Sequence, residues 1–498
     1  MGKPFLTVED LKLTFSLFCY IYGIGTLSMP KNYARAGFLW ATIALLFMAA
    51  ANIYATLCIS KILLVAPKRV RTFADLGEFC MGKFGRWSIF ITQMLTCFLG
   101  PIVYLVLGGS ILEIIFPNSY GEVTWIILMG FSLLPVALIP TMKEGAFAAA
   151  AGALGTILAD GIALYLLVSN MTPIPDGLKT PKPDVHFGDV ASVFGSLAFA
   201  YSPGIVIPAL QREHSEPSRM PRVILVTLGI ISVLFLTVAI TGVSFVGCQI
   251  PGNLLFSVAG APTALGFTAN RGGVILACLF MQLHITIAYA VTSNPMFHML
   301  EQIIFGLHKQ PAITDEEGGA FGAITTPQDN ATTEKGIEQV DSVIVNEDHE
   351  RDAQTYRQPG VYPKIAAMRI VVVAASVTLA CVWKNHMSDV LDFTGASCIA
   401  LCCMILPIVF YLKVFGRTNK VGKLEWVFAV VVVLITIFLG VHETYQSAKP
   451  LFNPQPAAAN AGSWDAVKFA YCPAGSSYQR MVYTNVSFHA NYTGPVGL

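Results

Sequence analysis

The 498-residue chain is 54% hydrophobic and only 12% charged, which is about half the charged fraction of an average soluble protein. This composition excludes a single soluble domain and predicts an all-α polytopic membrane protein. The net charge of +1 and the lack of a long basic run give no support for a nucleic-acid partner.

Eleven apolar segments have about the 20 or so residues that a helix needs to cross a bilayer. We predict transmembrane helices with these approximate bounds: 12–36, 38–65, 87–115, 123–140, 147–169, 188–210, 223–247, 272–305, 366–383, 388–412 and 425–443. Together they form a transmembrane domain, 12–443, between a short cytoplasmic N-terminus, 1–11, and an extracytoplasmic tail, 444–498. The acidic segment 307–365 inside this domain is predicted to be a disordered cytoplasmic loop.

Basic residues predict the orientation of these segments. If the N-terminus is cytoplasmic, 22 of the 31 Lys and Arg residues fall on the inner side, as the positive-inside rule requires. The C-terminus then lies outside the cell or in the lumen of an organelle. The plasma membrane is the favoured location, and a vacuolar or lysosomal-type membrane is the alternative, because a lumen is topologically equivalent to the exterior.

The predicted outer segments contain two further features. Asn-x-Ser/Thr patterns predict glycosylation at Asn170, Asn485 and Asn491. Only two of the 11 cysteines, Cys248 and Cys472, fall in outer segments. A disulfide between these two cysteines could persist on the outer side; the alternative is that they are two unrelated thiols.

Two predicted spans are interrupted near their middle. The first contains GIGTLSMP (23–30), in which Gly25 makes unwinding easier and Pro30 removes a backbone donor. The sixth contains AFAYSPGIVIPAL (198–210). Irregular backbone inside a bilayer persists only beside protein or a water-filled cavity. One such break alone could be a simple packing kink, but paired breaks in helices of opposite direction point to the binding site of a secondary transporter.

We therefore predict that the two breaks bind a polar solute, with the start of a half-helix holding a carboxylate. The predicted substrate-binding residues are Gly23, Gly25, Thr26, Leu27, Ser28, Tyr104, Tyr201, Ser202 and Gly204.

Three stretches resemble the amino acid/auxin permease family of the amino acid–polyamine–cation transporters. They are GIGTLSMPKNYARAGF (23–38), FGSLAFAYSPGIVIPALQREHSEPSRMPR (194–222) and LHITIAYAVTSNPMFHMLE (283–301). The resemblance implies a leucine-transporter-like fold, with two inverted five-helix repeats and an eleventh helix, and cation-driven transport of amino acids. The sequence departs from the family pattern at Lys31, where an aromatic residue is usual, and at Ser202-Pro203.

Two ionisable residues at membrane depth are the predicted proton-coupling residues. Asp160 lies about twelve residues into the fifth span and hence near the midplane, where a charged side chain is costly. It can take up and release a proton, or it can be a permanently neutral residue that hydrogen-bonds a neighbouring helix. His284 lies near mid-depth in the eighth span; the resemblance favours a proton relay or substrate contact, and a packing role is the alternative.

The leading prediction is a secondary active transporter that moves amino acids by alternating access in proton symport, with no cofactor, no metal and no obligatory protein partner. Sodium coupling is one alternative, with Thr26, Ser28 and Thr286 as oxygen donors. A transporter-like nutrient sensor that signals through 307–365 is another. No enzyme is expected, because the sequence lacks a zinc motif, paired deep aspartates and a nucleophile elbow.

Overall fold

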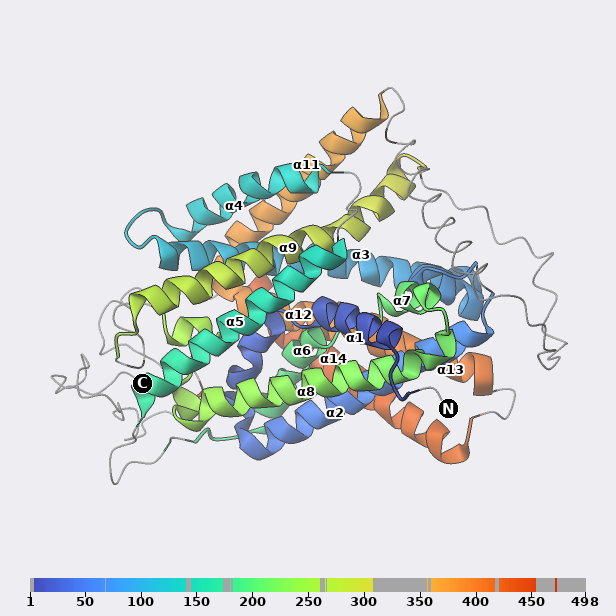
Figure 1. Ribbon diagram of the computed structural model, residues 1–498, viewed down its shortest axis with the longest axis horizontal. Helices are drawn as coiled ribbons and strands as arrows, with labels where there is room; N and C mark the ends of the chain where they lie inside the picture. Colours follow the sequence, from blue (N-terminus) through green and yellow to red (C-terminus); the bar gives the residue numbers. More distant parts are fainter. Residues whose placement is uncertain are drawn as a thin grey trace.

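The structure is a computed structural model, and it describes residues 4–67, 69–139, 145–172, 180, 182–259, 265, 267–307, 356, 360–416, 421–453 and 471–472. The regular elements in this part of the chain are all helices (Figure 1). Nine helical stretches within it are apolar and long enough to cross a membrane. The chain is therefore an all-α, multi-pass integral membrane protein.

The helices occur along the chain in the following order. The α-helices are α1 (Val8–Ile21), α2 (Met29–Val65), α3 (Phe73–Ile115), α4 (Glu122–Ala137), α5 (Gly145–Met171), α6 (Phe187–Ala200), α7 (Ile207–Glu213), α8 (Met220–Ser244), α9 (Arg271–Ile304), α11 (Val361–Val382), α12 (Met387–Thr394), α13 (Leu406–Phe415) and α14 (Lys423–Phe452). Short 3₁₀ helices are η1 (Ile24–Ser28), η2 (Pro217–Arg219), η3 (Gly247–Gln249), η4 (Leu255–Ser257) and η6 (Lys384–His386), and a π-helix, η7 (Gly395–Ile405), joins α12 to α13.

The helices form one elongated bundle, in which α4 and α11 pack together at one edge (Figure 1). Large apolar side chains are exposed on its outer faces; on α14, Leu434, Phe438 and Val441 are 58–67% exposed. An apolar surface of this kind is suited to contact with lipid tails rather than water.

One helix joins parts of two predicted spans. α2 contains Gly37, whose φ of 69° is readily adopted only by glycine. The chain turns there between the end of the first predicted span and the start of the second. By length and hydropathy, the helical residues on both sides of Gly37 form one candidate membrane span, Ile24–Val65. The two predicted spans are therefore not counted separately, and eleven crossings remain a prediction.

Backbone interruptions fall within the first and sixth predicted spans. α1 ends at Ile21, and η1 separates it from α2. α6 ends at Ala200, and α7 begins only at Ile207. η1 packs against α6, and a Cβ added to Gly25 would lie 2.7 Å from the Cβ of Ala200. The missing side chain of Gly25 therefore allows the two interrupted segments to touch.

The last helix is longer than predicted. α14 continues to Phe452, whereas the predicted span ended at 443. From residue 443 onward, Glu443, Ser447 and Leu451 recur every four residues and are buried. One face of the helix thus stays packed against the bundle even though its sequence becomes polar, so the first residues of the predicted tail, 444–498, are helical.

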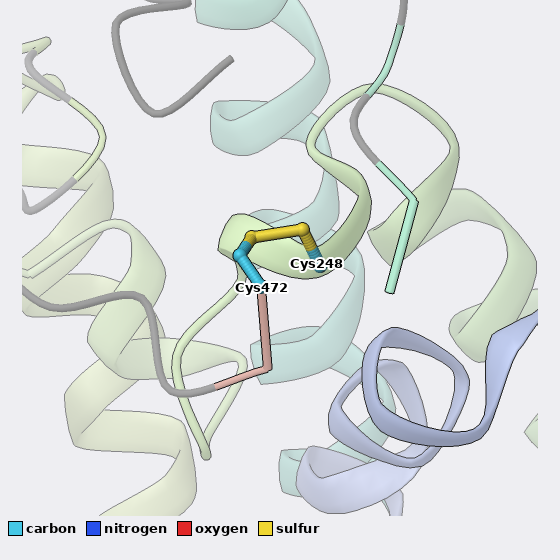
Figure 2. The surroundings of a disulfide bond; sticks show 2 residues. All are labelled: Cys248 and Cys472. Carbon is cyan, nitrogen blue, oxygen red and sulfur yellow. A yellow bond between two sulfur atoms is a disulfide. The ribbon is translucent and has the colours of Figure 1, made fainter. Parts of the chain in front are cut away.

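The predicted outer side contains a disulfide between Cys248 of η3 and Cys472 (Figure 2). It attaches the tail to the loop that follows α8. Asn170 lies in the last turn of α5, where its side-chain amide donates a hydrogen bond to the carbonyl of Leu166 at 2.7 Å. Asn485, Asn491 and nearly all of the predicted loop 307–365 lie outside the described residues.

Candidate functional site

A cavity of about 330 Å³ lies where the two interrupted helices meet. This volume falls in the range of small-molecule sites. The described residues that line it come from α1, η1, α3, α5, α6, α9, η7 and the 202–206 break, and include no Asp, Glu, Lys or Arg. Its hydrogen-bonding side chains, thiols aside, are those of Tyr20, Thr96, Tyr104, Ser202, His284 and Thr292.

Backbone groups supply the remaining polarity of the cavity. α1 and α6 both end at its wall, and the last carbonyls of a helix have no partner within that helix. Conversely, η1 begins at the wall with Gly23 as its N-cap, so its first N–H groups lack helical partners. Helix starts favour anions, and helix ends favour cations. The cavity can therefore hold a small molecule that carries a carboxylate and an ammonium group.

The predicted substrate-binding residues lie in three different places. The main cavity is lined by Gly23, Gly25, Tyr104 and Ser202. A separate hollow of about 10 Å³ is lined by Leu27 and Ser28. Neither hollow is lined by Thr26, Tyr201 or Gly204.

Local contacts explain why these last three residues do not line the cavity. The Thr26 hydroxyl donates back to the carbonyl of Gly23 at 3.1 Å. The Tyr201 hydroxyl lies 2.6 Å from the Ser232 hydroxyl on α8. A Cβ at Gly204 would lie 3.2 Å from Cα of Cys403, so this glycine packs against the π-helix.

Asp160 lies behind the cavity wall rather than in it. Its side chain is buried on α5, and the Tyr22 hydroxyl donates to its Oδ2 at 3.1 Å. Oδ1 has no hydrogen-bond partner among the described residues. Because Tyr22 directly precedes Gly23, this hydrogen bond connects the buried carboxyl group to the unwound segment.

His284 lines the cavity and faces the same segment. Its Nδ1 lies 3.1 Å from the carbonyl of Gly152. Since a carbonyl can only accept, Nδ1 carries the hydrogen, and Nε2 of a neutral ring is left as an acceptor. A Cβ at Gly23 would lie 2.8 Å from Nε2, so this nitrogen points at the backbone of the first break. It can accept a hydrogen bond there or take up a proton.

The prediction missed Tyr22 and an ion pair on the far side of the break. Nζ of Lys31 lies 3.1 Å from Oδ2 of Asp392 on α12, and both side chains are 5% exposed. The signal was present in the sequence, because both residues fall within predicted spans and ionisable residues at membrane depth are functional candidates.

Together, the apolar outer surface, the two interrupted helices and the cavity between them define a multi-pass membrane protein with an internal cavity large enough for a small molecule. Residues 9–448 match the family described as transmembrane amino acid transporter protein. The chain belongs to this family, which confirms the resemblance found in its sequence.

Similar proteins include two from Arabidopsis thaliana. The chain is 22% identical over 460 residues to amino acid transporter AVT1J, covering 88% of this chain and 92% of that protein. It is 20% identical over 448 residues to amino acid transporter AVT1I, covering 87% and 93%. Among solved structures, it is similar to MhsT in complex with L-phenylalanine (TM-score 0.48, 12% identity, 88% and 98% covered). It is also similar to a substrate-bound Na⁺-coupled sialic acid symporter (TM-score 0.47, 12% identity, 88% and 89% covered).

Proposed function

We propose that the protein is a proton-coupled amino acid symporter that works by alternating access. The observation that carries this proposal is the cavity between the two interrupted helices. It combines the first N–H groups of one helix with the last carbonyls of two others, and no Asp, Glu, Lys or Arg is among its described lining residues. A zwitterionic head group matches this arrangement.

The geometry suggests how such a substrate would bind. Its carboxylate would accept hydrogen bonds from the backbone at the start of η1, beside Gly23 and Gly25. Its ammonium group would face the carbonyls at the ends of α1 and α6. The apolar wall formed by Phe199, Ile205 and residues of α9 would then contact the amino acid side chain.

Asp160 and His284 support coupling to protons. Each can exchange a proton, and each lies against the first break, through Tyr22 and through Gly23 respectively. An ionised Asp160 is a strong acceptor for the Tyr22 hydroxyl, whereas a protonated carboxyl is a weaker one. Protonation would thus change a hydrogen bond at the edge of the binding cavity, and this is the proposed link between the proton and the substrate.

The test is transport by the purified full-length protein in liposomes. A panel of amino acids is offered under an inward proton gradient or an inward sodium gradient, each imposed alone. We expect accumulation under the proton gradient only. Accumulation driven by sodium alone would contradict proton coupling and favour the sodium alternative, and no accumulation of any amino acid would contradict the proposed cargo.

A pair of aspartate variants separates coupling from binding. Asp160→Asn should abolish gradient-driven accumulation but still permit exchange of labelled for unlabelled substrate. Asp184→Asn, the same change at an exposed loop position, is the matched control and should behave like the wild type. Full accumulation by Asp160→Asn would remove this residue from the mechanism.

We further propose that the protein acts in the plasma membrane, or in a vacuolar or lysosomal-type membrane, with its N-terminus in the cytoplasm.

A further inference from the structure

A second group of buried ionisable side chains lies apart from the cavity. As whole residues, backbone included, Lys31 of α2, Asp392 of α12 and Glu443 of α14 are 4%, 3% and 3% exposed. Lys31 and Asp392 form the ion pair described above. Glu443 lies within electrostatic range of both, and α14 packs directly against α12. None of the three lines the main cavity.

The charges in this group do not balance. Two carboxyl groups face one ammonium group, and an uncompensated buried carboxylate is very costly. Moreover, Oδ1 of Asp392 and Oε2 of Glu443 have no hydrogen-bond partner among the described residues. With both carboxyls ionised the group would carry a net charge of −1, so one more positive charge must enter it.

The surrounding charged residues do not supply that charge. The other charged groups within range of Glu443 are Arg35 and Asp389. Arg35 lies 3.6 Å from Asp189 of α6, and Asp389 lies 3.0 Å from His386, and all four side chains are 24–34% exposed. The Arg35–Asp189 pair is balanced in charge, and both pairs are partly solvated. Tyr471 also lies within electrostatic range of Lys31, and His442 is the next residue to Glu443 on α14; neither carries a fixed positive charge.

A proton fits this position better than a metal cation. Asp392 already has the Lys31 ammonium at 3.1 Å, and that ammonium would repel a second cation placed beside it. A proton needs no set of converging oxygen ligands. It would turn Glu443 into a neutral acid with a hydroxyl donor and leave the Lys31–Asp392 pair intact. The neighbouring 10 Å³ hollow, which Lys31 also lines, has about the space for one water molecule.

We propose that Lys31, Asp392 and Glu443 form a second proton-binding site, in which Glu443 carries the proton and Lys31 and Asp392 remain an ion pair. The site holds α2, α12 and α14 together while Glu443 is protonated. Loss of the proton places a second negative charge in the group and weakens the packing of the three helices. This proposal goes beyond the proposed transport function and does not depend on the cargo.

Infrared spectroscopy of the purified full-length protein, in detergent and without substrate, tests the site directly. Protonated carboxylic acids have a carbonyl stretch that ionised carboxylates lack. We expect Glu443→Gln to remove one such band at neutral pH. Glu425→Gln is the matched control on the same helix; Glu425 pairs with Lys61 at 3.2 Å near the other end, so the band should remain. A band that persists in Glu443→Gln overturns the assignment of the proton to Glu443.

A second variant tests the role of the ammonium group. Lys31→Met removes the positive charge, so Asp392 should also take a proton and one protonated-carboxyl band should be gained. An unchanged spectrum in a folded Lys31→Met protein contradicts the proposed charge balance.

Thermal unfolding gives an independent readout. The wild type should lose stability as the pH is raised and Glu443 ionises, whereas Glu443→Gln should be insensitive over the same pH range. Equal pH dependence in the two proteins contradicts the proposal. Because neither measurement involves transport, failure of the symport proposal would leave both outcomes interpretable.

Discussion

The contact between the two interrupted helices makes Gly25→Ala a sensitive test of the site. A Cβ at this position would lie 2.7 Å from Cβ and 2.8 Å from Cα of Ala200. Nonbonded carbon atoms pack at about 3.5–4.0 Å, so the two segments must separate by roughly 1 Å. Neither contact atom belongs to a flexible side chain that could move aside. Overpacking of this kind costs about 1–3 kcal/mol, and it displaces the backbone groups proposed to bind the substrate.

The assay pairs this variant with Gly229→Ala in α8, where an added Cβ meets nothing within 4 Å. In a helix that control change is stabilising by up to about 1 kcal/mol. Unfolding is followed in detergent with a thiol-reactive dye, because eight of the nine free cysteines in the described residues are buried. We expect Gly25→Ala to unfold at a lower temperature than the wild type, Gly229→Ala to unfold at the wild-type temperature or above it, and only Gly25→Ala to lose most of its amino acid uptake in liposomes. A wild-type unfolding temperature together with wild-type uptake in Gly25→Ala would refute the close contact.

Three further variants probe other parts of the molecule. Tyr22→Phe keeps the ring but removes the hydroxyl that donates to Asp160; we expect lower accumulation in a proton gradient and unchanged substrate affinity by calorimetry. Cys248→Ser removes a cross-link between residues 224 positions apart, worth up to about 5 kcal/mol by loop entropy; its unfolding temperature should fall and become insensitive to reductant. Burial alone would raise the pKa of Asp10. Hydrogen bonds from Arg219, at 2.7 and 2.9 Å, and from other groups have the larger effect, and the net pKa lies well below the usual range of an aspartate. The stability that the ionised Asp10 contributes is therefore fully present above about pH 4 and is lost as the pH falls below that value. Asp10→Asn should unfold at a lower temperature than the wild type at neutral pH. Its unfolding temperature should also fall less than that of the wild type between about pH 7 and 3.

Segment length and composition are enough to predict the all-helical membrane fold, because an apolar stretch of about 20 residues is suited to crossing a bilayer as a helix. Helix ends are harder to predict. The turn at Gly37 depends on a single positive φ angle inside an otherwise helical run. The extension of α14 past Glu443 depends on which of its faces packs against the bundle, and an individual polar residue does not reveal this.

The position of the site follows from local sequence, but its lining does not. Gly25 and Pro30 mark the first break because of their own backbone properties. Which side chains enter the cavity depends on partners that come from other helices, as the Tyr201 contact with Ser232 illustrates. The sequence marks Lys31 and Asp392 individually as ionisable residues within predicted spans, but they are 361 positions apart, so only the folded structure reveals that they pair.

The disulfide has a consequence for how the protein is made. Cys248 follows α8, whereas Cys472 follows α14, so a ribosome must complete every described helix before the two sulfur atoms can meet. During that interval the loop after α8 depends on weaker contacts, such as the hydrogen bond from Leu254 N–H to the carbonyl of Leu27 at 3.0 Å. Formation of the Cys248–Cys472 bond therefore reports that α14 has been made and that the segment after it has reached the loop that follows α8.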